Sequence, residues 1–184
     1  NYPEQGSVEL TVNPRKSREF AVAVRIPAWS KITMVTVNGQ AVADVRPGSY
    51  LTVSRTWKEG DKIALNFDMR GRLTELNGYQ AIERGPVVLA RDTRLGEGFV
   101  DETCVVQTSG GYVELMPVTD KPAGVWMAFS APMKLGTDTE GRAAGIVQVP
   151  LCDFASAGNT WHPAVRYRVW LRRTFDPISD PWVE

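Results

Sequence analysis

The chain has 184 residues, of which 43% are hydrophobic and 23% are charged, and its 21 basic residues balance its 21 acidic residues. This is the composition of an ordinary globular protein that is long enough to bury a hydrophobic core, so disordered and fibrous classes are excluded. The charge has no long run of one sign and the apolar stretches are too short for a transmembrane helix, so we expect neither a nucleic-acid partner nor a membrane.

Short strands are predicted throughout the first half of the chain. Side chains two positions apart lie on the same face of a strand, and apolar residues alternate with polar ones over several stretches. Asn38-Gly39 favours a two-residue hairpin turn, because both residues tolerate positive φ. The strands predicted on these signals span residues 20–26, 33–38, 50–57 and 63–67. Residues 86–90 form a continuous apolar run, which is typical of a central strand covered on both faces.

A polar, glycine-containing connector over residues 93–98 interrupts the apolar pattern, and we predict a domain boundary there. Further strands are predicted over 112–116, 125–129, 145–151 and 165–171, with an exposed loop over 138–144. No segment keeps the helical period for three turns, so almost no helix is expected. The predicted fold is all-β, an antiparallel β-sandwich or jelly roll, with two consecutive β modules over 1–92 and 93–184.

The two cysteines, Cys104 and Cys152, belong to no CxxC motif and to no cysteine-histidine cluster. A structural zinc site is therefore not expected, since zinc needs about four converging ligands. Two buried thiols are favoured over a disulfide, because cysteine is commonly a small core residue. A bridge between them is the alternative. No metal and no cofactor is predicted for this chain.

Glu75 and Glu83 are two carboxylates that a hairpin could bring together, since Asn77-Gly78 favours a turn between them. Glycoside hydrolysis usually requires two carboxylates at a fixed separation across the scissile bond. The alternative, which we favour, is that both are solvated charges at a strand edge, with Glu83 paired to Arg84 or Arg91. No catalytic residue is therefore assigned.

Trp161 is at the centre of the group of residues that most resembles a binding site. It lies in the turn-rich stretch 155–163, outside any alternating row, and Asp153, Asn159 and His162 are close to it in the sequence. Carbohydrate binding requires an aromatic face that stacks on a sugar ring and a few hydrogen-bonding groups. The alternative is that Trp161 fills the end of a sandwich or an interdomain seam. His162 has no GxSxG motif to partner it in nucleophilic catalysis.

Five stretches with a specific order and spacing run through residues 1–92. They are Tyr2–Val12, Arg25–Trp29, Val35–Gly39, Arg55–Asp61 and Glu83–Val88. Together they resemble the middle β-sandwich region of glycoside hydrolase family 127, the β-L-arabinofuranosidase-like enzymes of plant-glycan-degrading bacteria. The second half resembles the C-terminal module that follows in this family more loosely, through Pro150–Phe154 and Tyr167–Leu171.

The resemblance implies a helical barrel, N-terminal to these modules, that bears the active site with a cysteine nucleophile, a glutamate and zinc. None of that barrel lies in these residues, so no catalytic residue is carried over. The implied partner is this catalytic barrel of the parent chain, with Trp126 and Trp170 as candidate interface aromatics. Because the chain opens on Asn1 without a leader, we expect a fragment or a processed product, and the resemblance favours a periplasmic or extracellular protein.

Three functional hypotheses follow from the sequence. The leading one is a non-catalytic accessory β-sandwich region of a glycoside hydrolase. The alternative is a carbohydrate-binding module that recognises plant-type oligosaccharides through loop aromatics, with Trp161, His162, Asn159 and Asp153 as its binding residues. The third is an independent hydrolase that uses Glu75 and Glu83.

Overall fold

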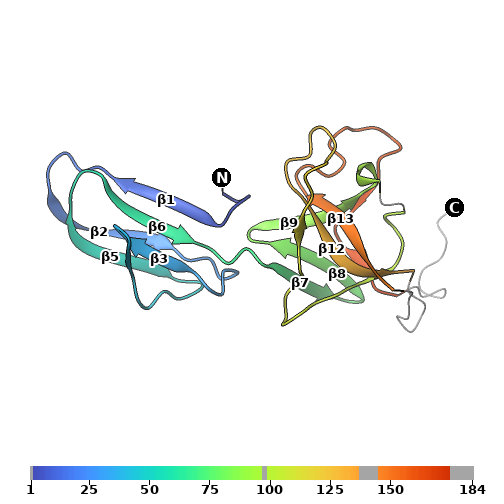
Figure 1. The fold of residues 1–184 in the computed structure, drawn as a ribbon, viewed down its shortest axis with the longest axis horizontal. Coiled ribbons are helices and arrows are strands. Elements are labelled where there is room, and N and C mark those ends of the chain that lie inside the picture. The colour runs from blue at the N-terminus through green and yellow to red at the C-terminus, as the bar shows by residue number, and fades with distance from the viewer. Residues whose placement is uncertain (1, 97–98, 137–144, 175–184) are drawn as a thin grey trace. The chain divides into compact units, whose positions relative to one another are not determined.

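The computed structural model describes residues 2–96, 99–136 and 145–174, and the chain divides into two compact units, Asn1–Met69 and Arg70–Glu184 (Figure 1). Within the described ranges the regular elements are strands, apart from one short 3-10 helix, so the all-β prediction is confirmed. No helix there is long and apolar enough to cross a membrane. The loop predicted over 138–144 lies outside the described residues.

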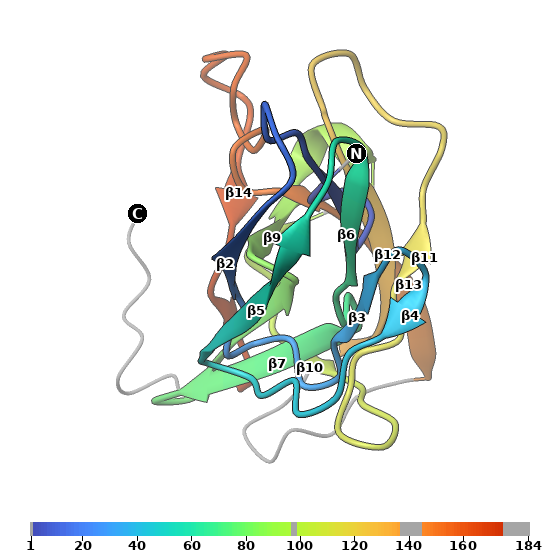
Figure 2. The same cartoon turned by 90° about the vertical axis from the view of Figure 1, so that its left-hand side faces the viewer.

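The first unit is a sandwich of two antiparallel sheets. One sheet has the strand order β1-β6-β3-β4, and β2 pairs with β5 to form the other, as the adjacent β2 and β5 arrows of Figure 2 show. The bounds are β1 Ser7–Val12, β2 Arg18–Arg25, β3 Met34–Val37, β4 Gln40–Ala41, β5 Tyr50–Trp57 and β6 Asp61–Asn66. Asn38 and Gly39 have positive φ and close the β3-β4 hairpin as predicted.

Trp57 lies in the core of the first unit. Its side chain is fully buried, and its indole Nε1 donates a hydrogen bond to the carbonyl oxygen of Phe20 at 2.9 Å. The inner faces of the two sheets surround it with buried apolar residues, namely Val24, Ile26, Val35, Val37, Ile63 and Leu65. A large apolar surface is thus buried without leaving the indole N–H unsatisfied, and this is the condition for a tryptophan to stabilise a core.

The second unit is one strongly curved antiparallel sheet. Its path runs β10-β12-β13-β9-β8-β15, while β7 pairs with β8, β11 with β12 and β14 with β9. Because β10 also lies close to β15, the sheet is nearly closed into a barrel. The bounds are β7 Gly71–Leu76, β8 Tyr79–Arg84, β9 Val87–Asp92, β10 Cys104–Val106, β11 Met116–Pro117, β12 Ala128–Leu135, β13 Ile146–Asp153, β14 Tyr167–Arg168 and β15 Leu171–Arg172.

Gln80 joins the sheet across the gap between β8 and β10. Its buried side-chain Oε1 accepts a hydrogen bond from the backbone N–H of Val106 at 3.1 Å, and its Nε2 donates to Glu75 at 3.1 Å. Among the described strands, β8 and β10 share no backbone ladder. The amide therefore replaces backbone pairing, and both of its polar ends are satisfied, as a buried amide requires.

The division between the units differs from the boundary predicted between residues 92 and 93. The strands β7, β8 and β9 span residues 71–92, and β8 and β9 pair with β13, β14 and β15 far along the chain. The polar stretch 93–98 begins with the 3-10 helix Thr93–Leu95, which is a turn within the second unit. Long-range strand pairing sets the boundary, and a local change in composition does not reveal it.

The strand predictions are confirmed most closely where alternation and tight turns coincide. β5 has the predicted bounds, 50–57. In the second half the segment 112–116 contributes isolated bridges and the start of β11, and the single strand predicted over 165–171 is the two short strands β14 and β15. Each of these short strands pairs over two residues, β14 with β9 and β15 with β8.

Candidate carbohydrate-binding surface

A buried ion pair anchors the turn-rich segment after β13 to the end of β9. The carboxylate of Asp92, which has no exposed area, lies 2.7 Å from Nη2 of Arg94 and also accepts from the Arg94 backbone N–H at 2.9 Å. The backbone N–H of Gly158 donates to the same carboxylate at 2.9 Å. Burial raises the pKa of Asp92, but the hydrogen bonds from Arg94 and Gly158 outweigh burial and hold this pKa below its usual range.

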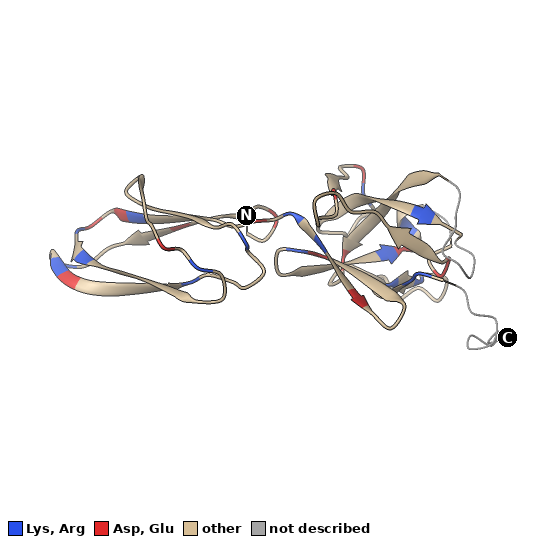
Figure 3. Ribbon diagram, turned by 90° about the horizontal axis from the view of Figure 1, so that it is seen from below, with Lys and Arg blue, Asp and Glu red and all other residues tan. Residues whose placement is uncertain are grey.

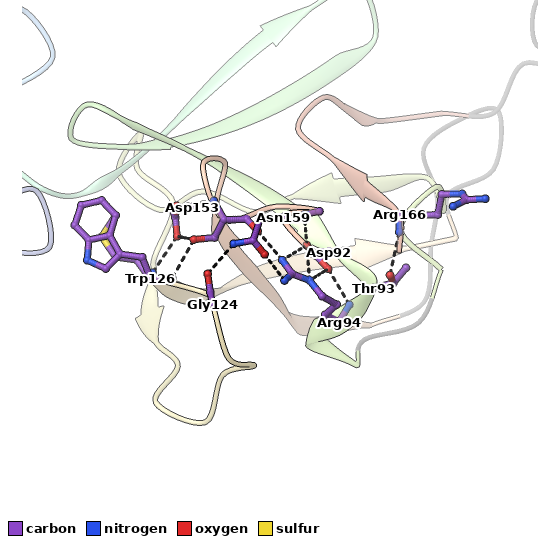
Figure 4. Close-up of polar contacts among 11 residues, drawn as sticks. Asp92, Thr93, Arg94, Gly124, Trp126, Asp153, Asn159 and Arg166 are labelled. Carbon is purple, nitrogen blue, oxygen red and sulfur yellow. Dashed lines mark hydrogen bonds and ion pairs between the residues drawn. The ribbon is translucent and has the colours of Figure 1, made fainter. Parts of the chain in front are cut away.

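Arg94 extends this network to the surface. Its Nη1 donates to Oδ1 of Asn159 at 2.7 Å and its Nη2 donates to the carbonyl oxygen of Ser156 at 2.6 Å, while Nδ2 of Asn159 donates to the carbonyl oxygen of Gly124 at 2.9 Å (Figure 4). Asn159 is exposed, and each end of its amide keeps one further hydrogen-bonding position. Its amide is therefore fixed in place and retains hydrogen-bonding capacity toward solvent.

Asp153 lies beneath the surface, although the sequence placed it among the binding residues. Its side chain is 1% exposed. Its carboxylate accepts hydrogen bonds from the backbone N–H of Met127 at 3.0 Å, from that of Ser156 at 2.9 Å and from the Ser156 hydroxyl at 2.7 Å. Ser156 Oγ in turn accepts from the backbone N–H of Trp126 at 3.0 Å. Asp153 therefore shapes the turn and presents no face to a ligand.

Trp161 and His162 are both at the surface, on the turn after Asn159. Trp161 is 92% exposed and has a φ of 54°, which is a left-handed conformation that few non-glycine residues adopt. Its backbone N–H donates to the carbonyl oxygen of Gly158 at 3.2 Å, and His162 Nδ1 accepts from the N–H of Ala164 at 3.2 Å. The structure thus presents the indole fully to solvent, and the imidazole has one nitrogen engaged by the chain.

Two exposed aromatic residues near this turn were not predicted as site residues. The rings of Phe154 and Tyr167 lie 6.1 Å apart, and about half of the Phe154 surface is exposed. Gly158 packs against Tyr167, since a Cβ at Gly158 would come within 2.6 Å of the ring. Pairing of β14 with β9 brings Tyr167 to this position. Such a pairing between distant segments leaves no local sequence signal.

Glu75 and Glu83 point to opposite faces of the β7-β8 hairpin. Glu75 lies opposite Gln80, and Glu83 lies opposite Arg72. Residues opposite each other share a face of the sheet, and Arg72 is three positions from Glu75 on β7, so the two carboxylates lie on opposite faces. Glu75 forms an ion pair with Arg173 at 3.0 Å, and Glu83 binds Arg72 and Thr74. They do not form a catalytic pair, and the surface-charge interpretation is supported with Arg72 as the partner of Glu83.

Cys104 lies in β10 and Cys152 in β13; both side chains are buried, and neither forms a disulfide. Burial raises the pKa of the Cys152 thiol to about 12, so this thiol stays protonated at neutral pH. In the described residues no three His, Cys, Asp or Glu side chains are grouped so that they could hold a metal ion. The described residues around this turn supply surface aromatics and amides.

The first unit is similar to a domain of known proteins. The family model for the GH127 middle domain of β-L-arabinofuranosidase matches residues 1–69. A solved glycoside hydrolase is similar to 95% of this chain over 31% of its own length, with a TM-score of 0.74 and 27% identity. A GH127 β-L-arabinofuranosidase from Geobacillus stearothermophilus T6 gives a TM-score of 0.70 and 24% identity, covering 95% of this chain and 29% of that one.

A GH127 β-arabinofuranosidase of known structure gives a TM-score of 0.68 and 22% identity, over 93% of this chain and 30% of that one. No curated protein sequence matches the chain. The chain thus spans less than a third of the length of these solved proteins. The family match ends at Met69, where the first compact unit ends, while for the second unit the likeness is one of fold.

Proposed function

We propose that this chain is the non-catalytic β region of a GH127-type glycoside hydrolase and that it packs against a catalytic domain of the same protein. The observation that carries the proposal is the coincidence of the GH127 middle-domain match with the first compact unit. Alignment of 95% of the chain with 31% of a glycoside hydrolase extends it to the second unit. Catalysis would belong to the part of such a protein that this chain does not align with.

Side chains at the surface support an accessory role. Glu75 and Glu83 face away from each other and are each paired with arginine. Trp126 and Trp170 are 45% and 43% exposed, and large aromatic residues at the surface are typical of protein interfaces. We therefore assign these two tryptophans to the contact with the catalytic domain.

The test measures activity and association separately. The purified chain should not hydrolyse an aryl β-L-arabinofuranoside, and turnover by it would contradict the proposal. Added to a separately produced catalytic domain from the same coding sequence, the chain should raise the melting temperature of that domain. Trp126→Ala and Trp170→Ala should weaken this effect, whereas Tyr50→Ala, which removes another exposed aromatic, should leave it unchanged.

A second candidate function is oligosaccharide binding through the surface around Trp161. The observation that favours it is the nearly complete exposure of the Trp161 indole beside Asn159, whose amide is fixed by Arg94 and Gly124. Stacking on a sugar ring together with an amide hydrogen bond is the recognition that such a pair offers.

Arabinan-derived oligosaccharides provide the test of this second function. Binding should change the tryptophan fluorescence of the chain, and Trp161→Ala should abolish the change. Trp170→Ala is the matched control, because it removes an exposed tryptophan elsewhere on the second unit. A flat titration with the unaltered chain would remove this candidate and leave the accessory role untouched.

A further inference from the structure

One end of the first unit carries a groove that neither proposed function uses. It is formed by the loop over residues 13–17, which crosses from β1 in one sheet to β2 in the other. The apolar residues Val12, Pro14 and Phe20 and the cations Arg15, Lys16 and Arg18 line it. A groove with an apolar wall and several like charges is suited to a ligand that has both an apolar face and the opposite charge.

The loops around this groove are fixed to one another by hydrogen bonds. Asn13 Oδ1 accepts from the backbone N–H of Gly60 in the β5-β6 turn at 2.9 Å. Asp61, at the end of the same turn, accepts from Asn38 Nδ2 at 2.9 Å and from the backbone N–H of Lys58 at 2.9 Å. Three loops are therefore joined before any ligand binds, which lowers the ordering cost of binding.

The groove is lined by three cations and no carboxylate, although acidic residues lie near it. Arg15 and Lys16 are exposed, and within the described part of the chain neither forms an ion pair. The Arg18 guanidinium lies 5.3 Å from the centroid of the Phe20 ring, which holds it over the apolar wall. The acidic residues near the groove are Glu19, which follows Arg18 in the chain, and Glu59 and Asp61 of the β5-β6 turn. The Asp61 carboxylate already accepts hydrogen bonds from Asn38 and Lys58. Figure 3 shows basic and acidic segments together at this end.

We propose that this groove binds a sugar carboxylate, namely a hexuronate residue within an oligosaccharide. Arg15 and Lys16 would pair with the carboxylate through charge-assisted hydrogen bonds. The ring face of a hexuronate carries C–H groups that can pack on the apolar residues Val12 and Pro14 of the lining. The choice of a sugar rests on the proposed glycoside hydrolase context, whereas the choice of an anion rests on the loop alone.

The test is calorimetric titration of the full chain with trigalacturonate at low ionic strength, compared with its methyl ester, which has the same rings without the charge. The acid should bind saturably and the ester should not. Arg15→Ala/Lys16→Ala should weaken binding at least about tenfold, because two charge-assisted contacts are lost. Lys31→Ala/Arg46→Ala removes the same charge from exposed positions outside the groove and should change binding less than about twofold.

Equal binding of the ester, unchanged binding by the Arg15/Lys16 double variant, or no binding of the acid would each overturn the proposal. Displacement of the acid by an equal charge concentration of polyglutamate would also overturn it, by identifying an acidic peptide as the ligand class. Far-UV circular dichroism of both double variants checks that they fold. The assay needs no catalytic domain, so a negative result leaves the accessory role intact.

Discussion

The two units bury different kinds of residue. Among the described residues, the only polar side chain buried in the first unit is that of Ser30, whereas the second unit buries Gln80, Arg91, Asp92, Asp153 and Ser156. The first unit is a small sandwich whose longest connections, over 26–33 and 42–49, are shorter than the segment 154–166 of the second unit, and its inner faces are closed by apolar side chains. The second unit has long irregular segments, and the backbone groups of these segments must be satisfied by side chains. Specific buried polar groups therefore hold the loops of the second unit in place.

The largest expected effect is on the first unit, from Trp57→Ala. The substitution removes a fully buried indole and its hydrogen bond to Phe20, and loss of a large aromatic side chain from a core costs about 3–5 kcal/mol. Hydrogen exchange measured on peptides from each unit should show faster exchange in β2 and β5.

Thr52→Ala is the control for this prediction, since Thr52 lies on the exposed face of β5. It should change stability by less than about 0.5 kcal/mol. If Trp57→Ala accelerates hydrogen exchange equally in β8 and β13, the two units do not unfold separately, and the prediction that only the first unit is destabilised is wrong.

Asp92→Asn should produce the next largest effect, and in the second unit. The variant keeps the shape of the side chain but leaves the guanidinium of Arg94 without its charge partner, and breaking a buried pair costs about 3 kcal/mol. The turn over residues 153–162 should lose protection, because Gly158 and Asn159 are held to β9 through this pair.

The matched control is Glu83→Gln, which removes the carboxylate of a partly exposed pair with Arg72. It should cost less than about 1 kcal/mol, since exposed pairs contribute little. An equal loss of stability in Asp92→Asn and Glu83→Gln would show that burial does not determine how much each ion pair contributes.

The residues in this comparison also show what the sequence could predict. The Asn38-Gly39 turn and strand β5 depend on neighbours in the chain, so their local pattern is enough. The contact of Asp92 with Gly158 joins positions far apart, and no local pattern marks it. The sequence predicts Asp153 as a binding residue because a polar residue that shapes a turn and one that binds a ligand look alike in sequence. Its burial distinguishes the two roles.

Acid should weaken the second unit more than the first. The pKa of Asp92 in the folded chain lies below the ordinary value of 3.8, so its ionised form stabilises the folded state above that pH, and this contribution is lost as pH falls through the folded pKa. Hydrogen exchange at pH 7, 4 and 3, corrected for intrinsic rates, should show protection of the turn 153–162 falling below pH 4. In Asp92→Asn this acid dependence should disappear, and its persistence would assign the effect to another carboxylate.

The smallest expected losses of stability come from Gly39→Ala and Gly78→Ala. The first substitution lies in an Asn-Gly hairpin turn of the first unit and the second in an Asn-Gly hairpin turn of the second unit. Each glycine follows an asparagine in a two-residue hairpin turn and has a φ near 80°, with no other atom within 4 Å of an added Cβ. The cost is therefore backbone strain alone, about 1 kcal/mol in each unit. Gly145→Ala is the control, because it has equal space and no positive φ. Denaturant unfolding should give similar losses for the two turn variants and almost none for the control, since a hairpin turn makes the same local demand whatever surrounds it.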